Sequence, residues 1–352
     1  DAWKIFHYMP ETNAASWNAI ISGNYRQGNA MKAFEVFDQM LAETIPDSVT
    51  FAIMFSMCTD QEALIKGRIL HSFLVDVLSE QEVLVGNSLI NMYGKIGSLR
   101  DAQHIFERME DKNVVTWNSM IKVSTVYEQE HDILLLFDRM WKAGVLFNEL
   151  TFVIMLDFYT SFGAGISGSL LHALIIESGV ELDGIVTTAL LNMYGKCGIL
   201  EDAFNIFKNI SKKDVVTWTA IISIYSCSGH VREALLLLMQ MQHNGMVLDK
   251  ITLTSILSAC SRGGFLEEGQ YYIFQTFKDQ KSIAVPEHLD CVLDLHARIG
   301  KLEEAEMMIN YIPFQPTIIT WTSLLVACQT AGVAERANIA VYHMSELDVR
   351  AS

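Results

Sequence analysis

A long internal repeat limits the folds that this chain can adopt. The segment LINMYGKIGSLRDAQHIFERMEDKNVVTWN, from Leu89 to Asn118, returns 101 residues later as LLNMYGKCGILEDAFNIFKNISKKDVVTWT, from Leu190 to Thr219. Tryptophans recur with the same spacing, at steps of 100, 101 and 103 residues, at Trp17, Trp117, Trp218 and Trp321. Self-similarity at a fixed distance is typical of repeat architectures, in which each repeat packs against its neighbours.

Each period divides into units of roughly 35, 35 and 31 residues, and each unit has the pattern of a helical hairpin. In the first unit, Trp17, Ile20 and Ile21 have helical spacing, Gly28 ends the first helix, and a second apolar stripe begins at Ala33. Neither helix can bury its apolar stripe alone, so neighbouring hairpins must stack. The sequence therefore predicts an all-α solenoid of stacked helix-turn-helix hairpins.

The unit pattern also predicts the organisation of the chain. Residues 14–317 are expected to form nine hairpins, which begin at Ala14, Ser48, Val83, Val114, Glu149, Gly184, Val215, Lys250 and Pro286. Residues 1–13 look like the tail of a truncated unit, so we expect the chain to be cut from a longer one. Residues 318–352 begin like a hairpin but diverge. Glycines that favour left-handed backbone are expected in the inter-helix turns, at Gly28, Gly97, Gly198, Gly229 and Gly300.

Composition permits a large core and raises one objection. Hydrophobic residues make up 51% of the chain and charged residues only 19%. Three of the six cysteines, Cys58, Cys260 and Cys328, stand eleventh in their units, which favours buried structural thiols in a reducing compartment over metal ligands. The net charge of −16 argues, taken alone, against nucleic acid as a partner.

The motifs resemble those of plant pentatricopeptide repeat proteins of the PLS class, in which P, L and S motifs of about 35, 35 and 31 residues alternate. The resemblance rests on VVTWN followed by GVLFN, on NMYGKCGILEDAFNIF, and on LTSILSACSRGGFLEEG followed by EHLDCVLDLHARIGKLEEAEMMI. Residues 318–352 resemble the first extension motif of this class. The resemblance implies a right-handed superhelix that binds single-stranded RNA, one base per repeat, in a mitochondrion or chloroplast.

In the family, the fifth and last residues of each P or S motif, here called a base-reading pair, select the base. Carried over, Asn18 with Asp47 would prefer U. The pairs that would prefer C over U are Asn87 with Asn113 and Asn118 with Asn148. The pairs that would prefer G are Thr188 with Asp214 and Thr219 with Asp249. The expected preference is U-n-C-C-n-G-G, since Ala52/Glu82, Val153/Asp183 and Asp290/Thr317 fit no clear code.

The resemblance also implies roles for two further rows of residues, each at one fixed position of the motifs. The second residue of a motif sandwiches the bases, and these residues are Ala15, Leu84, Val115, Ile185 and Val216. The thirteenth approaches phosphate, and its basic members are Arg26, Lys95, Lys196, Arg262 and Arg298.

Simpler interpretations stay open for each row. Asn, Thr and Asp could cap helices, the aliphatic row could pack hairpin against hairpin, and the cations could be ordinary solvated charges. Capping alone does not explain why the polar fifth residue recurs in P and S units while L units carry Ala52 and Val153. The tryptophans and His71/His172 are better explained by packing than by chemistry.

The sequence predicts no enzyme in this segment. It contains neither the HxE nor the CxxC motif of zinc deaminases, and no other catalytic motif. No metal or other cofactor is expected, and catalysis would come from a missing domain or a partner. We expect a monomer that contacts no membrane, binds single-stranded RNA and cooperates with a deaminase-bearing protein or editing cofactor. Two alternatives remain: an organellar RNA processing or stabilisation factor, and a protein-binding helical scaffold.

Overall fold

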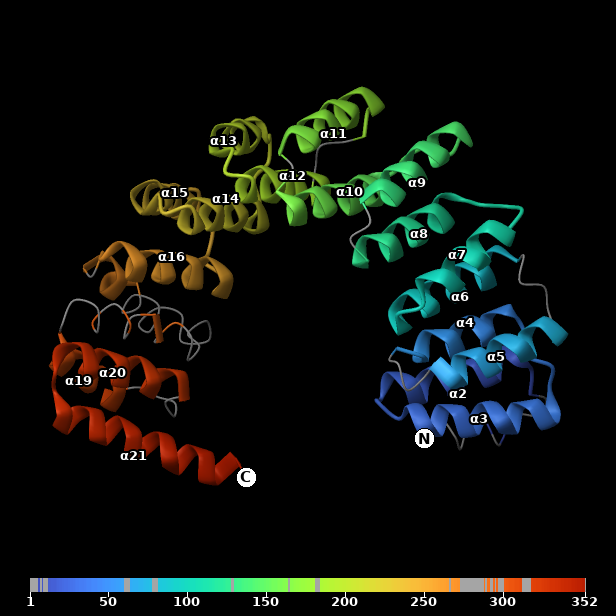
Figure 1. Ribbon diagram of the computed structural model, residues 1–352, viewed down its shortest axis with the longest axis horizontal. Helices are drawn as coiled ribbons and strands as arrows, with labels where there is room; N and C mark the ends of the chain where they lie inside the picture. Colours follow the sequence, from blue (N-terminus) through green and yellow to red (C-terminus); the bar gives the residue numbers. More distant parts are fainter. Residues whose placement is uncertain are drawn as a thin grey trace. The chain divides into compact units, whose positions relative to one another are not determined.

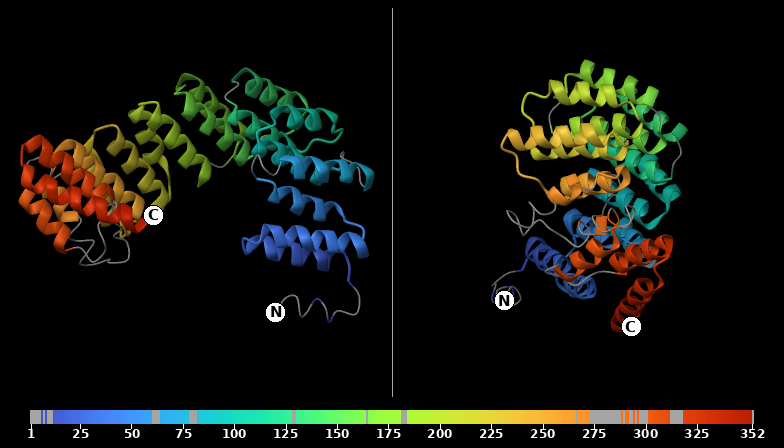
Figure 2. Two further views of the ribbon diagram at one scale, coloured as in Figure 1. Left: turned by 60° about the horizontal axis from the view of Figure 1, so that its bottom comes forward. Right: turned by 90° about the vertical axis from the view of Figure 1, so that its left-hand side faces the viewer.

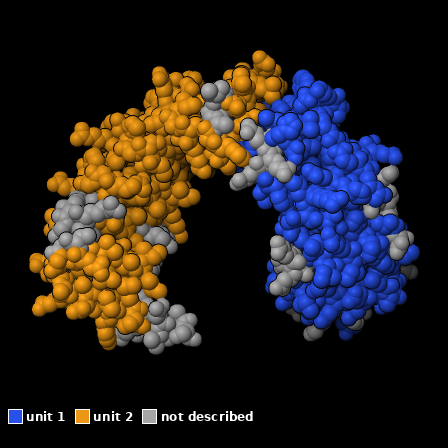
Figure 3. Space-filling view, in the orientation of Figure 1, with its two compact units in different colours: residues 1–158 blue, residues 159–352 orange. Residues whose placement is uncertain are grey.

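The computed structural model consists of helical hairpins and contains no strand in the parts that it describes. These are residues 6, 8, 12–59, 64–77, 82–127, 130–163, 165–180, 184–265, 267–272, 288, 290–291, 294, 296, 301–311 and 318–351. The chain divides into two compact units, Asp1–Phe158 and Tyr159–Ser352 (Figure 3). The predicted all-α architecture of stacked hairpins is confirmed.

Unit 1 contains four hairpins and most of a further helix (Figure 1). Its helices are α2 (Ala14–Arg26), α3 (Ala30–Glu43), α4 (Ser48–Met57), α5 (Leu64–Val77), α6 (Val83–Ile96), α7 (Leu99–Arg108), α8 (Val114–Val126), α9 (Glu130–Lys142) and α10 (Glu149–Phe162). The first helices of successive hairpins pack side by side, α2 on α4, α4 on α6 and α6 on α8. The blue hairpins α2/α3 and α4/α5 lie next to each other in the left view of Figure 2.

Unit 2 repeats the arrangement. Its described helices are α11 (Gly165–Ser178), α12 (Ile185–Lys196), α13 (Leu200–Asn209), α14 (Val215–Cys227), α15 (Val231–His243), α16 (Lys250–Gly263), α19 (Leu302–Tyr311), α20 (Ile318–Ala331) and α21 (Ala334–Ala351). Helix α12 packs on α14, α14 packs on α16, and α20 pairs with α21. First helices therefore pack in a row from α2 to α8 in unit 1 and from α12 to α16 in unit 2.

Aromatic side chains hold each hairpin to the next. The Trp117 ring meets Phe106 edge-on with centroids 4.9 Å apart, and Trp218 meets Phe207 in the same way at 4.8 Å. Both indoles are buried, as are those of Trp17 and Trp321. Such edge-to-face pairs contribute roughly 0.5–1.5 kcal/mol beyond the burial of their area. The tryptophans are thus packing residues, as the sequence predicts.

The turns between paired helices depend on glycine. At Gly97 the backbone is left-handed, with φ of 97°, and its N–H donates to the carbonyl of Tyr93, which closes helix α6. A side chain with a Cβ rarely adopts this conformation. Of the predicted turn glycines, Gly28, Gly198 and Gly229 also have positive φ, while Gly300 lies outside the described residues.

Cysteines follow the sequence prediction as well. Cys58, Cys260 and Cys328 are buried thiols in the core. Burial raises the pKa of Cys260 to about 12, so this thiol stays protonated and unreactive at neutral pH.

Candidate nucleic-acid interface

The fifth residue of each P unit lies in the first turns of a helix and contacts the last residue of the same unit. Asn18 Nδ2 donates to Asp47 Oδ1 at 3.0 Å, and Asn118 Nδ2 donates to Asn148 Oδ1 at 3.0 Å. Thr219 Oγ1 lies 3.4 Å from Asp249 Oδ2. In these three P hairpins, the structure therefore joins residues 29 or 30 positions apart.

The last residues cap the next helix, so the capping interpretation is right for them. Asp47 Oδ1 accepts from the Thr50 N–H at 2.8 Å, and Asp249 Oδ1 accepts from the Thr252 N–H at 2.7 Å. Asn113 and Asp214 do the same for α8 and α14. Caps of this kind stabilise a helix by about 1 kcal/mol.

Capping uses only one of the two polar side-chain atoms in several of these last residues. In Asp47 and Asp214 all hydrogen bonds to other described residues fall on Oδ1, which leaves Oδ2 open to a ligand. In Asn113 they fall on Oδ1 and leave the amide nitrogen. One side chain can thus cap a helix and meet a base at the same time.

The S units differ from the P units. Among the described residues, no hydrogen bond joins Asn87 to Asn113, or Thr188 to Asp214. Asn113 and Asp214 accept instead from N–H groups at the start of the next helix. The Thr188 hydroxyl donates to the carbonyl of Gly184 at 3.0 Å. The S-type pairs are therefore held by separate contacts.

Two buried amide oxygens at fifth positions lack a hydrogen-bond donor. These are Oδ1 of Asn18 and Oδ1 of Asn87, whose side chains are buried in the free protein. A buried oxygen without a donor costs roughly 1–3 kcal/mol, so such a group calls for a partner, which water or a ligand can supply. A donor from a ligand would satisfy it.

The carboxylates at this edge are ionised at neutral pH. Burial raises the pKa of Asp47, but hydrogen bonds from Thr50 and Asn18 outweigh it and leave the pKa below its ordinary value. For Asp214 the hydrogen bonds from the Thr217 hydroxyl and N–H lower the pKa. Both side chains are therefore acceptors, not donors.

The aliphatic second residues are exposed, so the packing interpretation is wrong for them. Val115 is 53% exposed and Val216 is 57% exposed, and Ala15, Leu84 and Ile185 are exposed too. The same exposure extends to second residues that the sequence analysis did not single out, Val49, Leu150, Ile251 and Ile319. Their position as second residues of their units could have identified them from the sequence. These exposed aliphatic side chains therefore share one position of the repeat.

The predicted cations divide into two kinds. Arg26, Lys95 and Lys196 are exposed near the ends of α2, α6 and α12. Arg262 instead donates to the Ser226 carbonyl at 3.1 Å and to Ser258 Oγ at 2.8 Å, and so ties α16 to α14. Arg298 lies outside the described residues.

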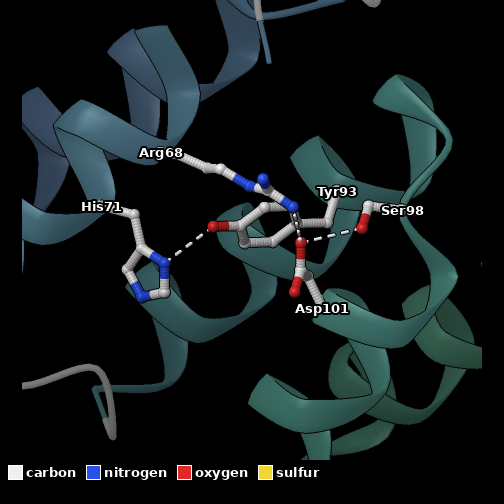
Figure 4. Close-up of polar contacts among 5 residues, drawn as sticks. All are labelled: Arg68, His71, Tyr93, Ser98 and Asp101. Atoms are coloured by element: carbon white, nitrogen blue, oxygen red, sulfur yellow. Dashed lines mark hydrogen bonds and ion pairs between the residues drawn. The ribbon is translucent and has the colours of Figure 1, made fainter. Parts of the chain in front are cut away.

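The two repeated histidines serve packing. His71 Nδ1 lies 2.8 Å from the Tyr93 hydroxyl, beside Asp101, which accepts from Arg68 and Ser98 (Figure 4). His172 meets Tyr194 at 3.1 Å, and burial lowers its pKa.

Positions without a clear code show no common pattern. Asp290 is buried and accepts from the Thr320 hydroxyl, while Thr317 and Asp183 lie outside the described residues. Within the described ranges, His, Cys, Asp and Glu form no cluster of three that could hold a metal ion. In the same part of the chain, no helix has the length and apolar character to cross a membrane.

The fold of stacked, repeated hairpins defines a helical-repeat protein. The PPR repeat family model matches residues 12–60 and 213–262, and the PPR repeat model matches residues 87–114, 115–145 and 185–215. Together these matches cover more than half of the chain. The chain belongs to the pentatricopeptide repeat family.

Relatives and solved structures agree with this assignment. One mitochondrial pentatricopeptide repeat-containing protein of Arabidopsis thaliana is 33% identical over 352 residues, which are 99% of this chain and 58% of the relative. A second, also named mitochondrial, is 33% identical over 94% of this chain and 52% of its own length. The chain thus spans about half the length of the curated relatives that it matches.

The fold is shared with a solved member of the family. The pentatricopeptide repeat protein PPR10, in complex with an 18-nt psaJ RNA element, superposes with a TM-score of 0.65 at 18% identity, over 98% of this chain and 57% of that one. A second structure, of PPR10 from maize, superposes with a TM-score of 0.60 at 16% identity, over 96% of this chain and 54% of that one.

Proposed function

We propose that this chain is a sequence-specific single-stranded RNA-binding segment that selects one base per repeat. The observation that carries the proposal is the repeated edge itself. A polar pair that keeps an open oxygen stands beside an exposed aliphatic side chain, as at Asn18 and Asp47 with Ala15. An unstacked base needs both features, an apolar face for its ring and polar groups for its Watson–Crick edge.

The unsatisfied oxygens of Asn18 and Asn87 support the same proposal. Both accept no hydrogen bond in the free protein, and amino or imino groups of a base are suitable donors. Assignment of the pairs to bases follows the family code and gives U-n-C-C-n-G-G. The three exposed cations Arg26, Lys95 and Lys196 would approach phosphates of the same strand.

The finer parts of the proposal rest on the family resemblance. We assign residues 14–317 to nine repeats of a PLS array, residues 1–13 to a truncated repeat and residues 318–352 to an extension-type motif. The protein would then act as a specificity factor for C-to-U RNA editing in a mitochondrion or chloroplast. The names of the two mitochondrial relatives favour the first organelle. A separate deaminase-bearing protein or domain would supply the chemistry.

A test of the proposal is a titration of the chain with an RNA that contains UnCCnGG. The comparison RNA has CC replaced by AA and GG by UU, and both are measured at two salt concentrations. We expect tighter binding of the first RNA at both concentrations, because base contacts depend less on salt than phosphate contacts do. Equal affinity for both RNAs would contradict base selection and favour a protein-binding scaffold, which the net charge of −16 would suit.

One substitution tests the residue assignment. Thr219→Asn, beside Asp249, reproduces the Asn18/Asp47 pair and should move preference at its base from G to U by about tenfold, or about 1.4 kcal/mol. Thr125→Asn makes the same chemical change at a residue whose hydroxyl donates to the Lys122 carbonyl, outside the base-reading pairs. This control should leave the preference unchanged. An unchanged preference in Thr219→Asn would contradict the assignment.

A further inference from the structure

A cleft of about 660 Å³ opens between α13, α14 and α15, in the second copy of the internal repeat. These three helices are adjacent in unit 2 (Figure 1). Three lysines line the cleft, together with an exposed aromatic ring and two side-chain amides: Lys208, Lys212, Lys213, Phe204, Gln240 and Asn244. Neither the base-reading pairs nor the row of thirteenth-position cations includes any of them.

The equivalent place in the first copy is built differently. There Arg139 forms a two-pronged salt bridge with Glu107, at 2.7 and 2.9 Å, and its guanidinium lies over the Phe106 and Trp117 rings. At the positions 101 residues later, Arg139 becomes Gln240 and Glu107 becomes Lys208, so no such pair covers Phe207 and Trp218. Asp111 likewise becomes Lys212, and Gln103 becomes Phe204.

These exchanges put basic side chains in the second copy where the first copy has acidic ones. Lys213 is already engaged, because its ammonium donates to the Ile210 carbonyl at 2.7 Å and lies 5.2 Å from the Phe207 ring centroid. Lys208 and Lys212 are exposed and have no hydrogen bond or ion pair through their ammonium groups to other described residues. On a chain with a net charge of −16, such a local cluster of cations indicates an anionic ligand.

The residue types fit a phosphate-bearing ligand that also carries a base. Lysine binds phosphate as a point charge, and the cleft adds groups that a simple carboxylate would not use. Phe204 is 39% exposed and offers an apolar face, and the amides of Gln240 and Asn244 can pair with a base edge. A nucleotide contains all three complementary groups.

The position of the cleft points to the same strand that the repeats bind. Lys212 stands two residues before Asp214, the last residue of a base-reading pair. Two residues span at most about 7 Å of extended chain, so a strand at Asp214 passes close to the lysines.

We propose that this cleft holds one nucleotide of the bound RNA outside the base-reading pairs. Lys208 and Lys212 face its phosphate, and Phe204 stacks on its base. The inference rests on the proposed RNA-binding function and adds a contact that contributes affinity without base selection by the repeat code.

The first copy supplies the variants that test this site. Lys208→Glu with Lys212→Asp installs the residues of the first copy, Glu107 and Asp111, in the same structural setting. Affinity for an RNA with UnCCnGG and six flanking nucleotides on each side should fall about tenfold or more. The slope of log K against log salt should shrink by about 0.7, the value for one phosphate contact to a single strand. The ratio of affinities between UnCCnGG and its GG-to-UU version should not change.

Two further variants separate the contributions. Phe204→Gln, which reproduces Gln103, should weaken RNA binding about tenfold with an unchanged salt slope, because it removes stacking and no charge. Lys32→Glu with Lys66→Asp makes the same change in net charge on α3 and α5 of unit 1, and is the matched control. Circular dichroism and thermal unfolding verify that each variant folds, and Lys208→Gln with Lys212→Gln replaces the first variant if that one unfolds.

The outcomes separate the two proposals. If the cleft variants bind RNA as the control does, the proposed site is wrong, even where free AMP or an acidic peptide binds the cleft. If the parent chain shows no preference for UnCCnGG, the proposed function fails before any cleft variant is measured.

Discussion

The two copies of the internal repeat share their packed interior and differ at their edge. In the first copy the ring centroids of His71 and Tyr93 lie 5.7 Å apart, and those of His172 and Tyr194 in the second copy also lie 5.7 Å apart. The ring centroids of the phenylalanine–tryptophan pairs are also at nearly equal distances, 4.9 Å in the first copy and 4.8 Å in the second. At the hairpin edge, by contrast, the first copy has an arginine–glutamate pair where the second copy has a lysine-lined cleft.

This contrast shows which positions packing constrains. A buried aromatic pair touches side chains on several helices, so any change in volume is felt by all of them. The Arg139–Glu107 pair is 38% and 55% exposed at its two side chains, and surface pairs of this kind contribute only about 0–1 kcal/mol. Its loss in the second copy therefore costs little stability and leaves the edge free to acquire a ligand.

The largest expected effect tests whether the two interiors are equivalent. Trp117→Ala and Trp218→Ala should each lower the free energy of unfolding by about 3–5 kcal/mol, because both indoles are 4% exposed and fill the contact between hairpins. Urea unfolding followed by far-UV circular dichroism measures the change. If the losses of unfolding free energy in the two variants differ by well above about 1 kcal/mol, the two interiors are not equivalent. Tyr8→Ala, at an exposed ring, is the control.

A smaller effect tests the close approach of first helices. A Cβ at Gly94 would lie 2.2 Å from Val123 Cγ2, and one at Gly195 would lie 2.4 Å from Ile224 Cγ1. Gly94→Ala and Gly195→Ala should each destabilise the chain by about 1–3 kcal/mol through overpacking. Gly23→Ala is the control, because a Cβ there meets no atom within 4 Å. Unfolding midpoints equal to that of Gly23→Ala would show that the helices separate without cost.

The smallest effect sharpens the difference between the copies. Asp214 caps α14, whereas Asn113, which does not ionise, caps α8. The pKa of Asp214 is below its ordinary value of 3.8, so its contribution to stability is present above that pH and is lost as the pH falls through the lowered pKa.

Hydrogen exchange can detect this loss locally. Between pH 5 and pH 2.5, the protection factor of the Thr217 amide should fall relative to that of Thr116, which occupies the same place in α8. Asp214→Asn should remove the difference. If both amides keep the same ratio of protection throughout, ionised Asp214 does not stabilise α14.

The sequence alone determined the helical hairpins, their order and their internal period. A repeat of apolar residues at fixed spacing has few ways to bury them, and stacking of hairpins is the solution that the spacing permits. It also identified Trp117 and Trp218 as packing residues and Gly97 and Gly198 as turn residues, because volume and backbone conformation follow from residue type.

Only the tertiary structure decided which side chains face a ligand. The sequence left the second residues open between packing and exposure, and the structure shows that they are exposed. It showed that Arg262 ties two helices together, and it placed Lys208, Lys212 and Phe204 around one cleft. These facts depend on contacts between helices that are distant in sequence, and residue type and spacing within one helix do not specify them.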